Sequence, residues 1–147
     1  MQKHKNNFIK FQLVNITTEQ FAVIEDAFDT ENKNVSFSVN IDFGIDKEQK
    51  LIISNVKVQF EQNKSVFLII EVSNQYIVDD TAWNEQINIK NKYIIPKGFA
   101  THLMVLTIGT LRGVLHAKTE NTEFNRFILP TLNVSELIDS DIETEVQ

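Results

Sequence analysis

A proline-started segment that is apolar on nearly every side most constrains what this chain can fold into. It begins at Pro96 and is expected to be helical to about Ala117, since proline suits a first turn, where its missing N–H is not needed. One apolar stripe at helical spacing consists of Ala100, Met104, Ile108, Leu111 and Leu115. A second stripe beside it consists of Phe99, Leu103, Leu106, Thr110 and Val114. Because no broad side is polar, its own domain must cover one side of this helix and a second chain the other.

Two glycines indicate where the second chain approaches. Gly109 and Gly113 each cost the helix roughly 1 kcal/mol relative to alanine. Small residues, however, let another backbone come close, which favours a helix–helix contact at this point. We therefore expect an obligate homo-oligomer. Its expected interface residues are Met104, Ile108, Leu111, Gly113 and Leu115.

Composition limits the classes of protein that this chain can represent. A length of 147 residues predicts a single domain, 1–147, with a sizeable core. The net charge is −6, and Arg112 and Arg126 are the only arginines. Nucleic acid is therefore not an expected partner, because neutralising phosphates requires clustered cations. The absence of cysteine excludes disulfides and thiolate metal sites.

The two ends of the chain are polar. No apolar segment of signal-peptide length follows residues 1–7, and no run approaches the roughly 20 apolar residues that span a bilayer. We therefore expect a cytoplasmic protein without membrane insertion. Residues 1–7 and 139–147 are expected to be flexible tails. The second tail is acidic, and the alternative is that it serves as a docking arm.

The first two-thirds of the chain shows the pattern of β-strands. Apolar and polar residues alternate from Val35 to Ile45, which predicts a strand with one wet face. The centre of the segment Ser65–Ser73 is apolar on both faces, as in a strand covered twice. The other predicted strands are Leu51–Phe60 and Phe8–Ile16, the latter continued by 21–25 after a bulge at Thr17–Thr18. The sequence therefore predicts a four-stranded antiparallel sheet, built largely from successive hairpins.

The remaining segments complete an α+β fold. Asn74–Ile94 is a long connection whose large side chains predict that it lies on an apolar surface. Phe124–Leu129 is expected to be extended, and Val134–Ile138 to form a short closing helix. The expected architecture is one sheet packed with one long helix and this short one.

No residue constellation in the sequence indicates catalysis. His102 and His116 are fourteen residues apart on the predicted helix, about 21 Å, which is too far to share a metal. The four glycines are isolated, so no phosphate-binding loop or nucleophile elbow occurs. The pair Asp79–Asp80 is interpreted as part of a turn. We expect no catalytic residue, no metal and no cofactor, and hence not an enzyme.

Phenylalanine is used heavily instead. The chain contains eleven phenylalanines and two tyrosines, which favours contacts that need no hydrogen-bond partner. One sheet and one helix offer a limited interior, so some of these rings are expected to line a groove for varied apolar ligands.

The last third of the chain carries a family pattern. Pro96 opens an apolar helix, Arg112-Gly113 lies near its end, and Leu129-Pro130-Thr131-Leu132-Asn133-Val134 follows. This order resembles the SecB-type protein-export chaperones, and Phe11-Gln12-Leu13 and Phe67–Val72 resemble strands of that family. The resemblance implies a twisted sheet with a long helix across it and a dimer of dimers joined through the helices. It also implies ATP-independent binding of unfolded polypeptides, which the family delivers to the SecA motor.

The resemblance also implies site residues. The client groove is expected between the sheet and the long connection, lined by Tyr76, Trp83, Ile87, Ile89 and Tyr93, with Phe37 and Phe43. Glu71 and Glu25 are the candidate SecA-docking acids, but Gln20 stands where the first strand would carry another. Two alternatives stay open: a chaperone dedicated to one partner, such as the antitoxin of a toxin–antitoxin pair, and a structural oligomerisation module.

Overall fold

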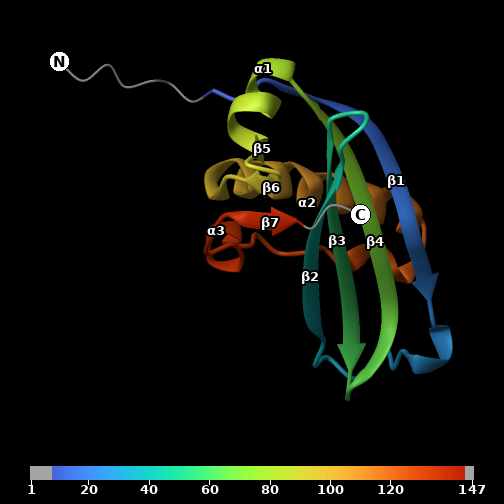
Figure 1. Ribbon diagram of the computed structural model, residues 1–147. Helices are drawn as coiled ribbons and strands as arrows, with labels where there is room; N and C mark the ends of the chain where they lie inside the picture. Colours follow the sequence, from blue (N-terminus) through green and yellow to red (C-terminus); the bar gives the residue numbers. More distant parts are fainter. Residues whose placement is uncertain (1–7, 145–147) are drawn as a thin grey trace.

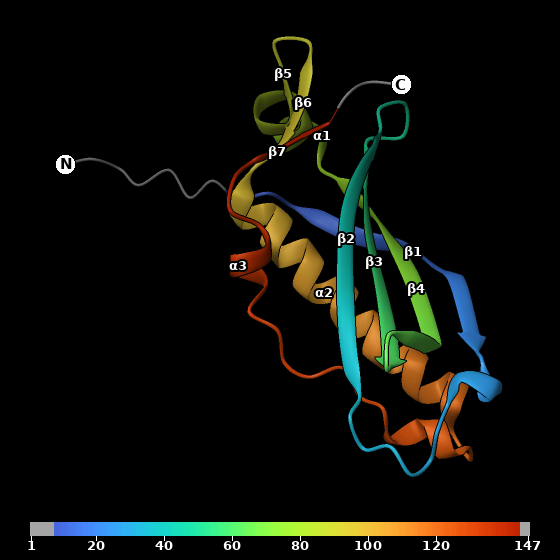
Figure 2. The ribbon, with the colours of Figure 1, turned by 90° about the horizontal axis from the view of Figure 1, so that it is seen from below.

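The computed structural model describes residues 8–144, and it has the predicted α+β architecture. Four antiparallel strands form one sheet, and the long helix α2 (Lys97–Thr119) crosses one face of it (Figures 1 and 2). The strands are β1 (Phe11–Val23), β2 (Ser36–Asp46), β3 (Leu51–Gln62) and β4 (Ser65–Val78). Their order is β1-β4-β3-β2, so β2, β3 and β4 follow as hairpins while β1 pairs with the far edge of β4.

Local turn chemistry fixes the two hairpins. Between β3 and β4, Asn63 and Lys64 both have positive φ, 50° and 67°, as two-residue hairpin turns require. Between β2 and β3, the Asp46 carboxylate accepts hydrogen bonds from the backbone N–H groups of Glu48 and Gln49, each at 3.1 Å. The β1–β4 register shifts between Leu13 and Asn15 and again between Thr18 and Gln20, close to the predicted bulge.

One side of α2 forms the core with the sheet. Its fully buried apolar residues pack against the inner residues of β3 and β4, such as Ile52, Val56 and Ile70. Each such side chain contributes about 1.5–3 kcal/mol relative to leaving it exposed. This packing corrects the expected oligomer interface, because four of its five residues lie in the chain's own core: Met104, Ile108, Leu111 and Leu115.

α2 is also long and apolar enough to cross a membrane, as judged by length and composition alone. The expectation that no segment approaches this length is therefore wrong. The core helix of a protein that packs on a sheet meets the same criterion, and Leu103 and Leu111 are fully buried against the rest of the chain. That the chain does not insert into membranes stays a prediction.

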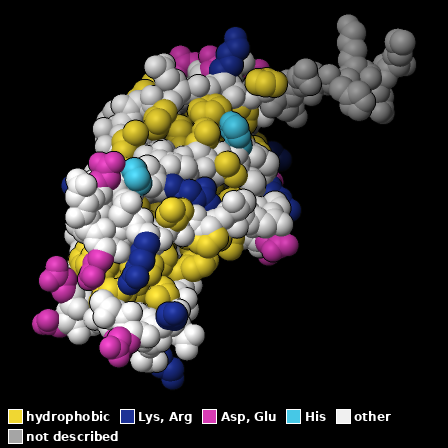
Figure 3. All heavy atoms as spheres, turned by 180° about the vertical axis from the view of Figure 1, so that it is seen from behind, with side chains coloured by type: hydrophobic (Ala, Val, Ile, Leu, Met, Phe, Trp, Pro, Cys, Tyr) yellow, Lys and Arg dark blue, Asp and Glu magenta, His cyan; other side chains and the backbone are white. Residues whose placement is uncertain are grey.

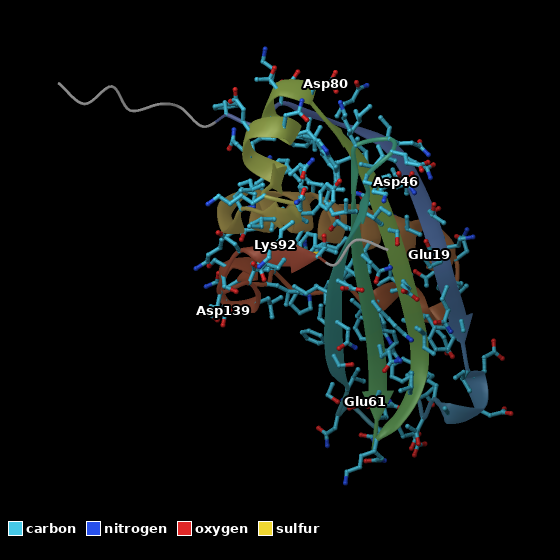
Figure 4. The ribbon with its side chains drawn as sticks, viewed as in Figure 1. Glu19, Asp46, Glu61, Asp80, Lys92 and Asp139 are labelled. Atoms are coloured by element: carbon cyan, nitrogen blue, oxygen red, sulfur yellow. The ribbon has the colours of Figure 1, made fainter. Side chains whose placement is uncertain are left out.

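The long connection is largely regular structure. β4 continues to Val78, and the short helix α1 (Asp80–Ala82) leads into one π-helical turn, η2 (Trp83–Ile87). A small hairpin follows, β5 (Asn88–Ile89) and β6 (Lys92–Ile95). Asp80 lies at the end of the molecule where this connection starts (Figure 4), and its carboxylate forms an ion pair of 2.7 Å with Lys50.

The chain then returns along α2. The 3₁₀ turn η3 (Glu123–Arg126) replaces the first part of the expected extended run, and α3 (Val134–Leu137) is the predicted closing helix. Arg112 holds this segment against α2, since its guanidinium donates to the carbonyls of Leu129 at 2.9 Å and Pro130 at 2.6 Å.

The C-terminal strand β7 (Ile142–Thr144) was not expected. It pairs with β6, so that β5, β6 and β7 form a second, small sheet. The expectation of a flexible tail is therefore wrong for residues 142–144. The expected tail residues 1–7 and 145–147 lie outside the described part of the chain.

Candidate functional site

An apolar cavity of about 510 Å³ opens where the start of β1, the connection and the start of α2 meet. It lies against the helix that occupies the back of the molecule, where hydrophobic side chains gather on the surface (Figure 3). Its lining consists of Phe8, Ile9, Phe11, Gln86, Pro96, Gly98, Phe99 and His102. Such a lining suits one or two large apolar side chains of a ligand better than a polar metabolite.

The ring of Phe11 lines this cavity and packs against three other rings. Its centroid lies 5.4 Å from that of Phe99, 5.6 Å from that of His102 and 5.7 Å from that of Tyr76, all in edge-to-face geometry. Phe8, by contrast, is 82% exposed. The cavity therefore combines fixed rings with one large apolar side chain that is free to contact a ligand.

A buried polar network fixes Tyr76 behind these rings. The Asn74 side-chain amide donates to Tyr76 Oη at 2.9 Å and to Thr110 Oγ1 at 2.9 Å. Tyr76 Oη also lies 3.0 Å from Thr107 Oγ1, which in turn donates to Ser54 Oγ at 2.9 Å. This network joins the sheet to α2, although the buried Asn74 Oδ1 has no hydrogen-bond partner among the described residues.

The predicted groove residues separate into three groups. Tyr76, Trp83 and Ile87 are core residues, between 0% and 2% exposed, so the expectation that they line an open groove is wrong. Ile89 and Tyr93 lie on the β5–β6 hairpin and are partly exposed, and the Tyr93 ring lies 5.7 Å from that of Trp83.

The other two predicted groove residues lie on β2. Phe37 is 38% exposed and packs on Phe60, while Phe43 stands opposite Ser54 in the β2–β3 register. Neither residue lines the cavity.

Sequence reasoning missed the residues that do line the cavity. Phe8 and Phe11 fall at the start of the first strand, and Phe99 and His102 lie one turn apart at the start of α2. The only signal in the sequence was that Phe99 belongs to the second apolar stripe of the predicted helix, with His102 three residues further along. What the sequence did not show is that the start of β1 lies beside the start of α2.

Much of the phenylalanine excess is ordinary packing at the other end of the molecule. A cluster of rings joins the loop after β1, the strands and η3: Phe28, Phe60, Phe67, Phe124 and Phe127. The guanidinium of Arg126 lies over two of these rings, 5.2 Å from the centroid of Phe28 and 5.0 Å from that of Phe127.

The candidate docking acids lie on different elements. Glu71 is half-buried on β4, stands opposite Lys57 in the register, and accepts a hydrogen bond from the Asn55 amide at 3.0 Å. Glu25 is exposed at the start of the 3₁₀ turn η1 (Glu25–Ala27), beside a second hollow that also contains Lys118. In the part of the chain that the structure describes, no group of acids or histidines could hold a metal ion.

Apolar residues on the helix side of β1 and on α2 are left uncovered. Leu13 and Ile16 stand opposite Tyr76 and Asn74, which contact α2, so both point to the helix side of the sheet. They are nevertheless 40% and 50% exposed. On α2, Val105 and Leu106 are 48% and 40% exposed, and a Cβ atom added at Gly109 or Gly113 would meet no other atom within 4 Å. We call Leu13, Ile16, Val105 and Leu106 the β1–α2 surface.

Comparisons with known proteins identify the fold. No protein-family model matches the sequence, and no curated protein matches it. Among solved structures, the Mycobacterium tuberculosis SecB-like chaperone Rv1957, in complex with a ChAD peptide from the antitoxin HigA1 (Rv1956), aligns at a TM-score of 0.54 and 8% identity, covering 83% of this chain and 90% of that one. A protein of unknown function from Streptococcus agalactiae aligns at a TM-score of 0.45 and 14% identity, covering 85% and 98%. The first likeness shows that this chain has a SecB-like fold.

Proposed function

We propose that this chain is a molecular chaperone that holds extended apolar segments of non-native polypeptides without ATP. The observation that carries the proposal is the apolar cavity beside Phe8, Phe11 and Phe99, on a SecB-like fold. A solved protein of that fold holds a peptide, which supports a peptide as the ligand here.

The contacts that such a cavity offers are weak and non-directional. Burying one Phe or Leu side chain contributes about 1.5–3 kcal/mol, and part of this is offset by the entropy lost on association. One cavity of about 510 Å³ therefore binds a client only weakly. Holding a whole polypeptide requires several cavities that act together, which an oligomer supplies.

We further propose a homo-oligomer in which a second copy covers the β1–α2 surface. The outer edge of β1 pairs with no other strand among the described residues, and this strand has thirteen residues and no proline. An unpaired edge of that length, beside exposed Leu13 and Ile16, favours pairing with another chain. A dimer of dimers stays a prediction, as does docking to SecA through Glu25 and Glu71.

The first test measures the light scattering of a chemically unfolded, aggregation-prone protein as it is diluted into buffer without ATP. Suppression at near-stoichiometric ratios is expected. Phe8→Ser should weaken it several-fold, because Phe8 is an exposed part of the cavity. Ile128→Ser is the matched control, since Ile128 is 67% exposed but lies outside the cavity lining. A wild-type protein that suppresses no aggregation would refute a general holdase.

A second candidate is a chaperone dedicated to one partner. The complex of the SecB-like neighbour with an antitoxin peptide favours it. A dedicated chaperone would bind one peptide of a varied panel at least tenfold more tightly than the others, whereas a general holdase would bind many peptides alike. Failure to bind any peptide would favour the structural oligomerisation module instead.

A further inference from the structure

The C-terminal strand β7 is the edge strand of the small sheet. Its residues Ile142, Glu143 and Thr144 stand opposite Ile95, Ile94 and Tyr93 of β6. Its other side lies near β2, the edge strand of the large sheet (Figure 1). Just before β7, Asp141 Oδ1 accepts a hydrogen bond of 2.8 Å from the backbone N–H of Lys97, in the first turn of α2.

Few interactions hold β7 in this position. It has three residues, and its one apolar side chain, Ile142, is only partly buried. The hydroxyl of Thr144 is buried and has no hydrogen-bond partner among the described residues, so it adds no bond that holds the strand. Glu143 is exposed. A strand held in this way can leave at moderate cost and expose the edge of β6.

The edge that β7 covers has the features of a peptide-binding edge. Its backbone groups can pair with any extended chain, and β6 presents Tyr93 on the face that also carries Ile95. The Tyr93 ring is supported from behind by that of Trp83. An incoming strand with an apolar residue in the place of Ile142 would meet the same contacts.

The charges near this edge favour an acidic segment. Three exposed lysines lie on the elements around it: Lys90 in the turn before β6, Lys92 on β6 and Lys97 at the start of α2. Lys92 is the diagonal neighbour of Glu143 on one face of the pair, within reach of a long side chain. Asp139 lies on the same side of the molecule as Lys92 (Figure 4).

We infer that β7 is an internal occupant of a strand-addition site on β6, and that a client segment with an apolar residue between two acids displaces it. The inference rests on the proposed holding function, since it names where and how one class of client is bound. Because a client binds only while β7 is displaced, its apparent affinity is its intrinsic affinity multiplied by the displaced fraction. β7 is therefore an autoinhibitory contact.

A reversible covalent lock tests this directly in the full chain. Ile94 and Glu143 stand opposite each other, at a Cα separation that a disulfide spans, and the chain has no cysteine of its own. The variant Ile94→Cys/Glu143→Cys therefore fixes β7 to β6 when oxidised and frees it when reduced. The probe is a fluorescein-labelled peptide with the sequence of residues 140–147, measured by fluorescence anisotropy.

The reduced double variant should bind the probe, and oxidation should weaken binding at least tenfold, reversibly. The Glu143→Cys single variant, given the same oxidant, is the control and should show no such change. Ile142→Lys removes the apolar contact of β7 and should tighten probe binding by about tenfold. Leu137→Lys, at an exposed apolar residue of α3, should leave it unchanged. A probe whose acids are replaced by lysines should bind at least tenfold more weakly.

Equal probe binding by the oxidised and reduced double variant would overturn the inference, as would equal binding by Ile142→Lys and the wild type. The aggregation assay separates this failure from failure of the proposed function. If wild-type protein suppresses aggregation while the lock changes nothing, the strand-addition site is wrong and the holding function stands. If neither wild type nor Ile142→Lys suppresses aggregation, the proposed function itself fails.

Discussion

Replacing Trp83 with alanine tests whether this residue belongs to the core or lines the client groove. Trp83 is 2% exposed, its ring packs on Tyr93 at 5.7 Å, and its backbone N–H donates to the Asp79 carbonyl at 2.8 Å. The substitution leaves that backbone bond in place but removes the largest side chain of the connection. Deleting a buried tryptophan ring costs about 3–5 kcal/mol, because the cavity it leaves collapses only in part.

That cost is large beside the stability of a whole domain, about 5–15 kcal/mol. At about 2–4 °C for each kcal/mol in a domain of this size, the melting temperature should fall by about 6–20 °C. Urea unfolding, followed by circular dichroism, measures the loss, with wild type and variant compared at the same protein concentration because oligomerisation shifts the apparent stability. Trp83→Phe should lose clearly less, since it keeps a ring at the position.

Phe8→Ala is the matched control, because Phe8 is 82% exposed and lines the cavity. Its free energy of unfolding should stay within about 0.5 kcal/mol of the wild type, while its binding of unfolded client weakens. The reasoning from burial is refuted if Trp83→Ala keeps its urea midpoint and loses only client binding. Trp83 would then act at the groove, as the sequence alone suggested.

Three further substitutions test other parts of the structure. Gly113→Leu should reduce the oligomer without lowering the stability of the monomer, since space is open at Gly113 and the helix gains about 0.5–1 kcal/mol. Size-exclusion chromatography with light scattering measures the oligomer. An unaltered oligomer would show that Gly113 is not at the interface. Tyr76→Phe should cost about 1–3 kcal/mol in urea unfolding, because it leaves the Asn74 amide with one partner fewer. Arg112→Lys should cost about 1–2 kcal/mol and speed amide hydrogen exchange in residues 127–133, as an ammonium group cannot reproduce the two fixed bonds of Arg112 to Leu129 and Pro130.

The sheet could be predicted because its signal is local. Alternation with a period of two is a property of each strand alone, and β2 and β3 begin and end close to the predicted residues. The position of β1 beside β4 depends on pairing between residues such as Phe11 and Val78, far apart in sequence. No local pattern encodes such a pairing, so the order of the strands was not predictable from periodicity.

Which of the two apolar stripes of α2 faces the sheet could not be predicted from local pattern either. Both stripes are apolar, so periodicity cannot decide which of them faces the sheet. The structure places the stripe of Met104 and Leu111 inward, together with Thr107, whose hydroxyl bonds the Ser54 hydroxyl of β3. This hydroxyl pair fits only one orientation of the helix, but recognising it requires knowing that α2 lies on β3.

The connection was predicted to lie on an apolar surface, which the structure bears out for Trp83 and Ile87. The error was to assign the largest side chains to the groove. A large ring gains most by being fully buried, so Trp83 became core. The cavity is instead lined by residues near the first residue of two elements, Phe11 at the start of β1 and Phe99 in the first turn of α2.

A protein that exposes apolar surface must avoid binding itself. An unpaired, apolar strand edge is a template for aggregation, and in this fold both β1 and β6 would present one. β7 covers the edge of β6, and by our proposal a second copy covers that of β1 beside Ile16. The two contacts respond differently to protein concentration. β7 and β6 belong to one chain, so their pairing does not depend on concentration, whereas binding of a second copy does. Diluting the protein should therefore expose the edge of β1 while β7 still covers the edge of β6. Substitutions on the β1–α2 surface should change self-aggregation more than substitutions on β6.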